Sequence, residues 1–191
     1  MRIVFCGVGA LGSTAVVLSR NVSATLALVD FDRVESKNLL SQAFVKTSIG
    51  KNKADALKLE LLNFYGVRAE AFGVRLNEGN VDALCGAADL VVDAFDNAAS
   101  RRTLSTFARK TTKPLVHAAI SADATFGLVR WDERFEADEE DAEGQATCET
   151  GEHLPLIGLV AATLARAVQD FARDGTRRDF MIGSTFVSQT D

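Results

Sequence analysis

Cysteine and histidine are scarce in this sequence, and neither residue type forms a recognisable disulfide or metal framework. The 191 residues include three cysteines, Cys6, Cys85 and Cys148, and two histidines, His117 and His153. The cysteines are odd in number and form no CxxC pair, which favours a reducing compartment over a disulfide scaffold. Each histidine stands alone, so no zinc-ligand set is visible. We therefore expect a cytoplasmic protein without structural zinc.

Long apolar runs and excess positive charge are also missing. The longest uncharged apolar run, residues 154–165, is too short to cross a bilayer. A net charge of −5 argues against a surface built for nucleic acid or anionic membrane. The sequence contains no internal repeats and no low-complexity linkers. We expect a single domain over residues 1–191, which is enough chain to bury a sizeable core.

What the sequence does contain is a glycine fingerprint between two short apolar runs near its beginning. The pattern consists of apolar residues at 3–5, the glycines Gly7, Gly9 and Gly12, apolar residues at 26–29, and the acids Asp30 and Asp32. It predicts a strand, a turn, a helix and a second strand with an acid at its end.

Each glycine of this pattern has its own steric reason. Gly7 makes the tight turn, Gly9 lets backbone N–H groups approach a phosphate, and Gly12 lets the helix pack closely on the strand. The start of the helix offers partial positive charge to an anion. Asp30 is placed to accept hydrogen bonds from a ribose, so the stretch predicts a nucleotide site.

The same stretch has a second interpretation as a secretory signal peptide, because Arg2 precedes apolar residues as far as Leu18. Two observations favour the nucleotide site. The glycines interrupt the apolar run at fingerprint spacing, and no clean small-residue cleavage site precedes the next strand.

The rest of the chain alternates between helical and extended patterns. We expect helices at 52–63, 80–88, 98–110 and from Leu154 to Gly175, strands at 67–74, 90–92, 114–117, 125–131 and 179–187, and loops or short helical turns at 33–51. This rhythm predicts a Rossmann-like α/β fold, with a doubly wound, mostly parallel sheet, helices on both faces and a C-terminal edge strand.

Two C-terminal segments differ in composition from the rest. Residues 132–143 carry eight carboxylates and one arginine, which predicts a solvated, mobile crossover loop over about 132–147. Small residues then recur at helical spacing at Gly158, Ala161, Ala162 and Ala165. This face of the last helix is expected to pack closely on the sheet or on another helix, and a subunit interface is the alternative.

Five short motifs now occur in order. They are GVGALG at 7–12, DFDRVESKNLLSQ at 30–42, GKNKA at 50–54, DAFDN at 93–97 with Arg101 four residues later, and TCETGEHLPLIG at 147–158. Together they resemble the ThiF/MoeB/HesA family, the relatives of ubiquitin-activating enzymes, and more specifically its short, zinc-free ThiF-type members. The resemblance covers essentially the whole chain.

The resemblance implies an enzyme that binds ATP and Mg²⁺ and adenylates the C-terminal glycine of a small ubiquitin-like or sulfur-carrier protein. Residue by residue, it implies these roles: Gly7, Gly9 and Gly12 beneath the nucleotide, Asp30 and Asp32 at the ribose end, Asn38 and Gln42 facing the phosphates, Lys53 as the principal phosphate cation, Asp96 on the metal, and Asn97 and Arg101 shaping that turn. Cys148 matches the cysteine that in some relatives takes up the activated carrier or its sulfur.

Several of these residues also have plainer interpretations. Lys53 alone could be a solvated residue at a helix start, and Asp93 could simply cap a turn, so we assign the metal to Asp96. Cys6 and Cys85 are expected to be packing residues. Cys148 lies in an acidic stretch, whereas a low thiol pKa needs positive charge nearby, so its catalytic role stays open.

The sequence also departs from the family pattern. Ser41 stands where relatives carry the arginine of Asn-x-x-Arg-Gln, and we expect no N-terminal helix to lend a second arginine. In phosphoryl transfer one well-placed arginine is worth about 10³–10⁵ in rate. Four nearby cations are candidates to compensate: Arg33, Lys37, Lys46 and Lys51.

Three hypotheses follow. The first is an adenylyltransferase acting on a diglycine-ended carrier, preferably ThiS-like in thiamine biosynthesis. It would work as a homodimer, with a sulfur-donor protein as a further candidate partner. The second is a catalytically weakened or partner-dependent carrier-binding subunit, suggested by Ser41. The third is a nicotinamide dehydrogenase, which shares the glycine turn but leaves GKNKA, DAFDN and the Cys148 segment unexplained.

Overall fold

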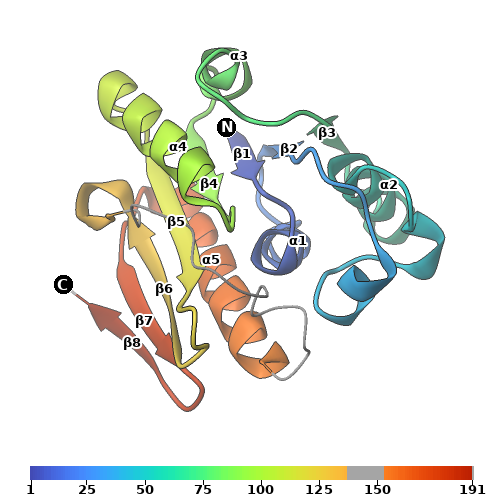
Figure 1. Ribbon diagram of the computed structural model, residues 1–191. Helices are drawn as coiled ribbons and strands as arrows, with labels where there is room; N and C mark the ends of the chain where they lie inside the picture. Colours follow the sequence, from blue (N-terminus) through green and yellow to red (C-terminus); the bar gives the residue numbers. More distant parts are fainter. Residues whose placement is uncertain (137–152, 191) are drawn as a thin grey trace.

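A computed structural model describes residues 1–136 and 153–190, and it is built around one mixed, twisted sheet (Figure 1). The strand order is β3-β2-β1-β4-β5-β6-β7-β8. The strands are β1 (Arg2–Cys6), β2 (Thr25–Val29), β3 (Ala69–Phe72), β4 (Leu90–Asp93), β5 (Leu115–Ile120), β6 (Phe126–Trp131), β7 (Asp179–Gly183) and β8 (Val187–Thr190). The α/β class with a mostly parallel sheet is confirmed.

The first five strands are parallel, and their carboxyl ends meet at one edge. β1 pairs with β2 on one side and with β4 on the other, which places Cys6 beside both Val29 and Asp93. The strands that follow β1 therefore add to one side of it, as β2 and β3, and those from β4 onward add to the other side. In open α/β sheets this reversal point is where ligands bind. The last three strands, β6 to β8, continue the sheet in antiparallel fashion.

Helices cover both faces of the sheet. They are α1 (Ala10–Leu18), α2 (Lys53–Tyr65), α3 (Val81–Cys85), α4 (Ala98–Thr111) and α5 (Leu154–Asp174), with short 3₁₀ turns η1 (Ser36–Leu40), η2 (Lys46–Ser48) and η3 (Asp132–Arg134). One apolar core joins α1, α2 and α5 to the sheet, and a second joins α3 and α4 to the opposite face. The stretch that also resembled a signal peptide thus forms β1, the glycine turn and α1 of this core.

Helix α5 is the longest helix among the described residues, and it packs on α1 and on β5 to β7 (Figure 1). By length and composition alone it could span a membrane, yet 56% of its most apolar stretch is buried inside the fold. Of the small-residue face, Ala161 and Ala165 are buried while Ala162 is exposed. The helix as a whole therefore packs on both another helix and the sheet.

Two sequence predictions were wrong in part. The single strand expected at 179–187 is a hairpin of β7 and β8, closed by the Gly183 amide donating to the Phe186 carbonyl at 2.9 Å. The Phe186 ring lies against Gly183 across this turn, where a Cβ on the glycine would lie 2.4 Å from Phe186 Cε1. The acidic segment also does not begin as a solvated loop, because Asp132 is buried in η3 and Phe135 is buried beside it. Residues 137–147 of the expected loop lie outside the described residues.

Candidate nucleotide site

The glycine turn after β1 fits against the turn after β4. Gly7 adopts φ +86°, and a Cβ on it would lie 2.8 Å from the backbone of Ala94 and Phe95. A Cβ on Gly12 would lie 1.9 Å from the Gly7 carbonyl oxygen. Only hydrogen fits at these two positions, so the turn and α1 are held close to β4.

Helix α1 begins at this turn with its first amides free of any side-chain cap. Gly9 occupies the N-cap position, and no acidic residue lies in the first turn of the helix. A Cβ built on Gly9 would meet no atom within 4 Å. The first N–H groups of a helix have no intrahelical partner, so they and the dipole face open space that suits a phosphate.

Asp30 braces this turn from the end of β2. Its Oδ2 accepts from the Val8 amide at 2.8 Å, and its Oδ1 accepts from the Asp32 amide at 2.9 Å. Burial raises the pKa of Asp30, while these two amides and the charge of Lys53 act in the opposite direction. The carboxylate is only 5% exposed, so its first role is to hold the glycine turn, which the sequence did not predict. Its contact with a ribose stays a prediction.

Asp32 and Lys53 form an ion pair beside the turn. The Lys53 Nζ lies 3.2 Å from Asp32 Oδ2, and the side chains are 10% and 48% exposed, respectively. Lys53 is the first residue of α2, and the N-cap side chain of Asn52 donates to the Asp30 and Asp32 carbonyls at 2.8 and 3.1 Å. GKNKA therefore ties the start of α2 to the end of β2, and it brings Lys53 to the predicted site.

Of the predicted phosphate-facing pair, Asn38 lies within the 3₁₀ turn η1 and Gln42 lies two residues after its end. Asn38 is buried, and its Oδ1 accepts from the Glu35 amide at 2.8 Å, so this amide caps η1. Gln42 Oε1 is buried and has no partner among the described residues. A buried acceptor without a protein partner can accept a hydrogen bond from a donor group of a bound ligand. Ser41, the departure from the family pattern, is the C-cap of η1.

The cations proposed to compensate for Ser41 lie around this loop. Arg33 Nη1 donates to the Gly50 carbonyl at 2.7 Å, and Lys37 pairs with Glu35 at 3.6 Å. Lys46 and Lys51 are exposed. Which of the four serves the phosphates stays a prediction.

The turn between β4 and α4 presents Asp96 at the same edge of the sheet. The Asp96 side chain is exposed next to the buried Phe95, whereas Asn97 is the N-cap of α4 and accepts from the Ser100 amide at 2.9 Å. Arg101 Nη2 donates to the carbonyls of Phe95 and Ala118. Asn97 and Arg101 therefore shape the turn, while the exposed Asp96 as a metal ligand stays a prediction.

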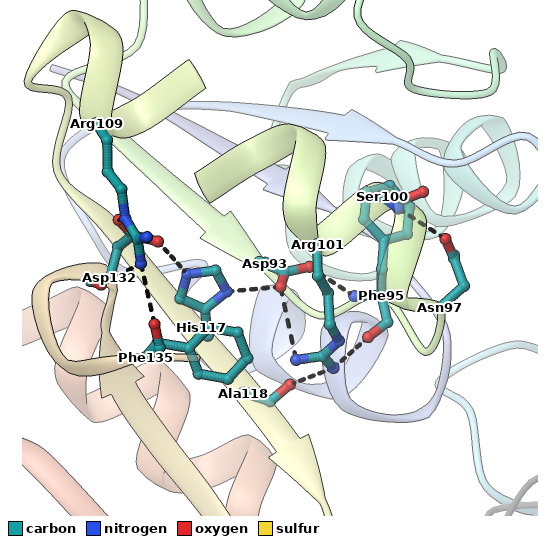
Figure 2. Close-up of polar contacts among 10 residues, drawn as sticks. All are labelled: Asp93, Phe95, Asn97, Ser100, Arg101, Arg109, His117, Ala118, Asp132 and Phe135. Carbon is teal, nitrogen blue, oxygen red and sulfur yellow. Dashed lines mark hydrogen bonds and ion pairs between the residues drawn. The ribbon is translucent and has the colours of Figure 1, made fainter. Parts of the chain in front are cut away.

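Behind this turn lies a buried ionic network that the sequence analysis missed (Figure 2). His117 stands between two carboxylates, with Nδ1 at 2.7 Å from Asp93 Oδ2 and Nε2 at 3.0 Å from Asp132 Oδ1. From the sequence His117 was considered only as an isolated candidate metal ligand, and these two carboxylate partners were not predicted. The only signal in the sequence was that a buried strand ends in Asp93 and the next in His117, and these residues are register partners of β4 and β5.

The three groups of this network have shifted pKa values. For each, burial disfavours the charged form, but the charged partners outweigh it. Arg101 and the His117 contacts lower the pKa of Asp93, and hydrogen bonds from His117 and Arg109 lower that of Asp132. Hydrogen bonds to Asp132 and Asp93 raise the pKa of His117.

Cys6 and Cys85, the two cysteines that the structure describes, are both buried, as expected. Cys6 and Cys85 are buried with their sulfurs 3.9 Å apart, and this contact and burial raise the pKa of Cys6. They are packing residues. Cys148 lies outside the described residues. Within residues 1–136 and 153–190, no group of three or more metal-ligating side chains is arranged to hold a metal ion.

Comparisons with known proteins agree with this geometry. The chain is 39% identical over 124 residues to the sulfur carrier protein adenylyltransferase of Thermus thermophilus, and 34% identical over 122 residues to the SAMP-activating enzyme E1 of Haloferax volcanii. Each match covers 62% of this chain and 45% of the relative, so the chain corresponds to less than half of either protein.

The fold also matches solved structures over its full length. The crystal structure of MccB from E. coli superposes with a TM-score of 0.79 at 18% identity, covering all of this chain and 64% of that one, and PaaA gives 0.75 at 16%, covering all of this chain and 63% of that one. These likenesses concern the fold. Residues 1–171 match the sequence profile of the ThiF family. The chain belongs to the ThiF family.

Proposed function

We propose that this protein uses ATP and Mg²⁺ to adenylate the C-terminal glycine of a small ubiquitin-like or sulfur-carrier protein. The observation that carries the proposal is the meeting of three elements at the sheet's reversal point. These are the uncapped start of α1 behind Gly9, the Lys53–Asp32 pair, and the turn that presents Asp96. The two relatives named above are an adenylyltransferase and an activating enzyme, which supports the same chemistry.

In this reaction the carrier carboxylate attacks the α-phosphate of ATP and pyrophosphate leaves. The protein must therefore position the reactants and offset developing negative charge, and it needs no nucleophile of its own. The first amides of α1 and the Lys53 ammonium would bind phosphate oxygens, and Asp32 with Asp30 would bind the ribose. Asp96 would hold the magnesium ion, which supplies further positive charge when bound.

The finer features of the proposal concern partners. A diglycine-ended, ThiS-like carrier is the preferred substrate, and a sulfur-donor protein is a second candidate partner. A homodimer in the cytoplasm is the expected form. Cys148 is the candidate acceptor of the activated carrier or its sulfur.

The test is pyrophosphate exchange. The protein is incubated with Mg²⁺, ATP, labelled pyrophosphate and a panel of diglycine-ended carriers, and label entering ATP is followed. We expect exchange with one carrier, and Lys53→Ala should reduce it about 10²–10³-fold, as removal of one transition-state donor does. Lys58→Ala is the matched control, because Lys58 is an exposed lysine on the same helix. Unchanged exchange in Lys53→Ala would overturn the site assignment.

A second candidate function rests on Ser41. If an arginine is needed at the phosphates, the protein is a carrier-binding subunit that depends on a partner for catalysis. This function would be favoured if the protein binds a carrier tightly but shows no pyrophosphate exchange, and if Ser41→Arg does not restore the exchange. Exchange by the wild type would exclude it.

A further inference from the structure

The network around His117 holds the backbone on which Asp96 stands. Asp93 Oδ1 accepts from the Phe95 amide at 3.0 Å, and Arg101 donates to the Phe95 carbonyl. Both backbone polar groups of the residue before Asp96 are therefore fixed by the network (Figure 2).

His117 in turn fixes Asp93 and Arg101. Asp93 Oδ2 faces both His117 Nδ1 at 2.7 Å and Arg101 Nη1 at 3.6 Å. The ring of Phe135 stacks on the imidazole at a centroid distance of 3.8 Å, and the Arg101 guanidinium lies 5.7 Å from the same ring. The imidazole and Asp93 are fully buried, so no water replaces these contacts in the closed core.

The geometry also defines the charge state of His117. A neutral imidazole has one donor and one acceptor, whereas both ring nitrogens here face carboxylate oxygens. Both contacts form hydrogen bonds with ionised carboxylates only when the ring is an imidazolium. The other charges facing the ring are those of Arg101 and Arg109 on α4, and its cross-strand partner on β6 is Arg130.

We propose that His117 is a positioning residue of the nucleotide site: held as an imidazolium between Asp93 and Asp132, it fixes Arg101 and the turn that presents Asp96. The expected effect of His117 on ligand binding rests on the function proposed above. Its effect on the turn itself is independent of that function.

The first test follows the turn directly in the ¹⁵N-labelled full chain by NMR. The imidazole signals of His117 and His153, the only histidines in the sequence, are titrated together with the backbone amides of residues 95–97. We expect the three amides to shift with the midpoint of His117. Amides that stay unchanged while His117 titrates would overturn the proposal.

Two variants and a control extend this test. Asp132→Asn removes one carboxylate, so the midpoints of His117 and of the three amides should move together to lower pH. His117→Asn should displace the amides at all pH values, whereas His153→Asn should leave them unchanged. If His117→Asn fails to fold, the wild-type titration and Asp132→Asn still decide the matter. Turn amides that keep their wild-type positions in a folded His117→Asn protein, or their wild-type midpoint in Asp132→Asn, would overturn the proposal.

The second test measures the affinity for Mg²⁺-ATP against pH. In the wild type we expect the affinity for Mg²⁺-ATP to fall as pH rises and His117 loses its proton. Loss of a residue that supports a metal ligand costs about 10–100-fold in metal affinity or activity. We therefore expect His117→Asn to lose affinity by this factor and to show no further fall at alkaline pH. Asp132→Asn should shift that fall to lower pH, which a general loss of stability would not do. Wild-type affinity and pH profile in His117→Asn would overturn the proposal. If the wild type binds no Mg²⁺-ATP, the proposed function fails. The role of His117 is then decided by the NMR titration of the turn amides alone.

Discussion

At the scale of single residues, the three glycines of the fingerprint have different physical constraints. Gly7 is required by its positive φ and by contact with the β4–α4 turn, and Gly12 by the Gly7 carbonyl 1.9 Å from its missing Cβ. Gly9 is required by neither, because a Cβ there meets only open space. Its constraint must come from what occupies that space.

This difference predicts opposite phenotypes for two similar substitutions. Gly12→Ala should lower the free energy of unfolding by about 1–3 kcal/mol or more, because backbone must move to admit the methyl group. Gly9→Ala should leave unfolding nearly unchanged but weaken nucleotide binding, because the methyl group fills the proposed phosphate position. Urea unfolding and ATP titration of both variants make the comparison. Wild-type ATP affinity in Gly9→Ala would show that the phosphates bind elsewhere.

At the scale of elements, caps place the site residues as much as the sheet does. Asn52 starts α2 so that Lys53 faces Asp32, and Asn97 starts α4 directly after Asp96. Both asparagines accept from an amide three residues later, which is the usual bond of a helix N-cap. The motifs GKNKA and DAFDN are therefore helix starts as well as candidate binding sequences.

Asn97 allows the structural and binding roles to be separated. Asn97→Ala should cost about 1 kcal/mol in unfolding free energy because the Ser100 amide loses its acceptor. Asn97→Asp should keep most of that stability, because aspartate caps equally well. Denaturant unfolding gives the stability, and ATP titration shows whether the amide group itself binds ligand. Equal stability of the alanine and wild-type proteins would contradict the cap.

Helix α5 and strand β6 also pack closely against each other. A Cβ on Gly127 would lie 2.3 Å from Val160 Cγ2, so Gly127→Ala should destabilise the fold by about 1–3 kcal/mol through overpacking. Adding Val160→Ala removes the clashing methyl group and should recover part of the loss. A double-mutant cycle in urea measures this coupling. Strictly additive losses would mean that the two residues do not compete for space.

At the scale of the whole molecule, the buried network joins four separate segments. Asp93 comes from β4, Arg101 and Arg109 from α4, His117 from β5 and Asp132 from η3. Folding takes Asp93, His117 and Asp132 out of water, and pairing among the charged groups keeps them ionised. The side chain of Arg109 stays 59% exposed. This cluster should therefore contribute to the pH dependence of the molecule's stability.

The sign of that dependence follows from the shifted pKa values. His117 has a raised pKa, so its contribution is complete below its ordinary value of 6.5 and is lost as pH rises through the raised value. Asp93 and Asp132 have lowered pKa values, so theirs is present above 3.8 and lost as pH falls through the lowered values. Asp30, whose pKa is raised, acts in the opposite sense on the acid side.

The alkaline limb is therefore the one to measure. Unfolding free energy should fall as pH rises above 6.5, and a tenfold difference in proton affinity between folded and unfolded states corresponds to about 1.4 kcal/mol. Urea unfolding from pH 6 to 9 tests this, with His153→Asn as the control that keeps the slope. A slope that persists in His117→Asn would assign the pH dependence to another group.

The sequence by itself determined the local elements. Helix caps and apolar periodicity act within a few residues, so α2 (Lys53–Tyr65) was predicted over 52–63, and α5 from Leu154 to Gly175. The β1–α1–β2 unit was equally visible, because its glycines and terminal acids lie within one short stretch. Parallel strands bring their carboxyl ends to one edge, so the same patterns also predicted where the candidate nucleotide site lies.

The tertiary structure decided what depends on partners distant in the chain. Asp93 and His117 are 24 residues apart and became neighbours only through the register of β4 and β5. Asp132 was expected in solvent because its neighbours are acidic, yet Arg109 and His117 neutralise it in the core. Asp30 braces the glycine turn for a similar reason, since Val8 reaches it only when β1 and β2 pair. Local sequence encodes local hydrogen bonds, whereas burial and charge pairing are set by which strands become neighbours.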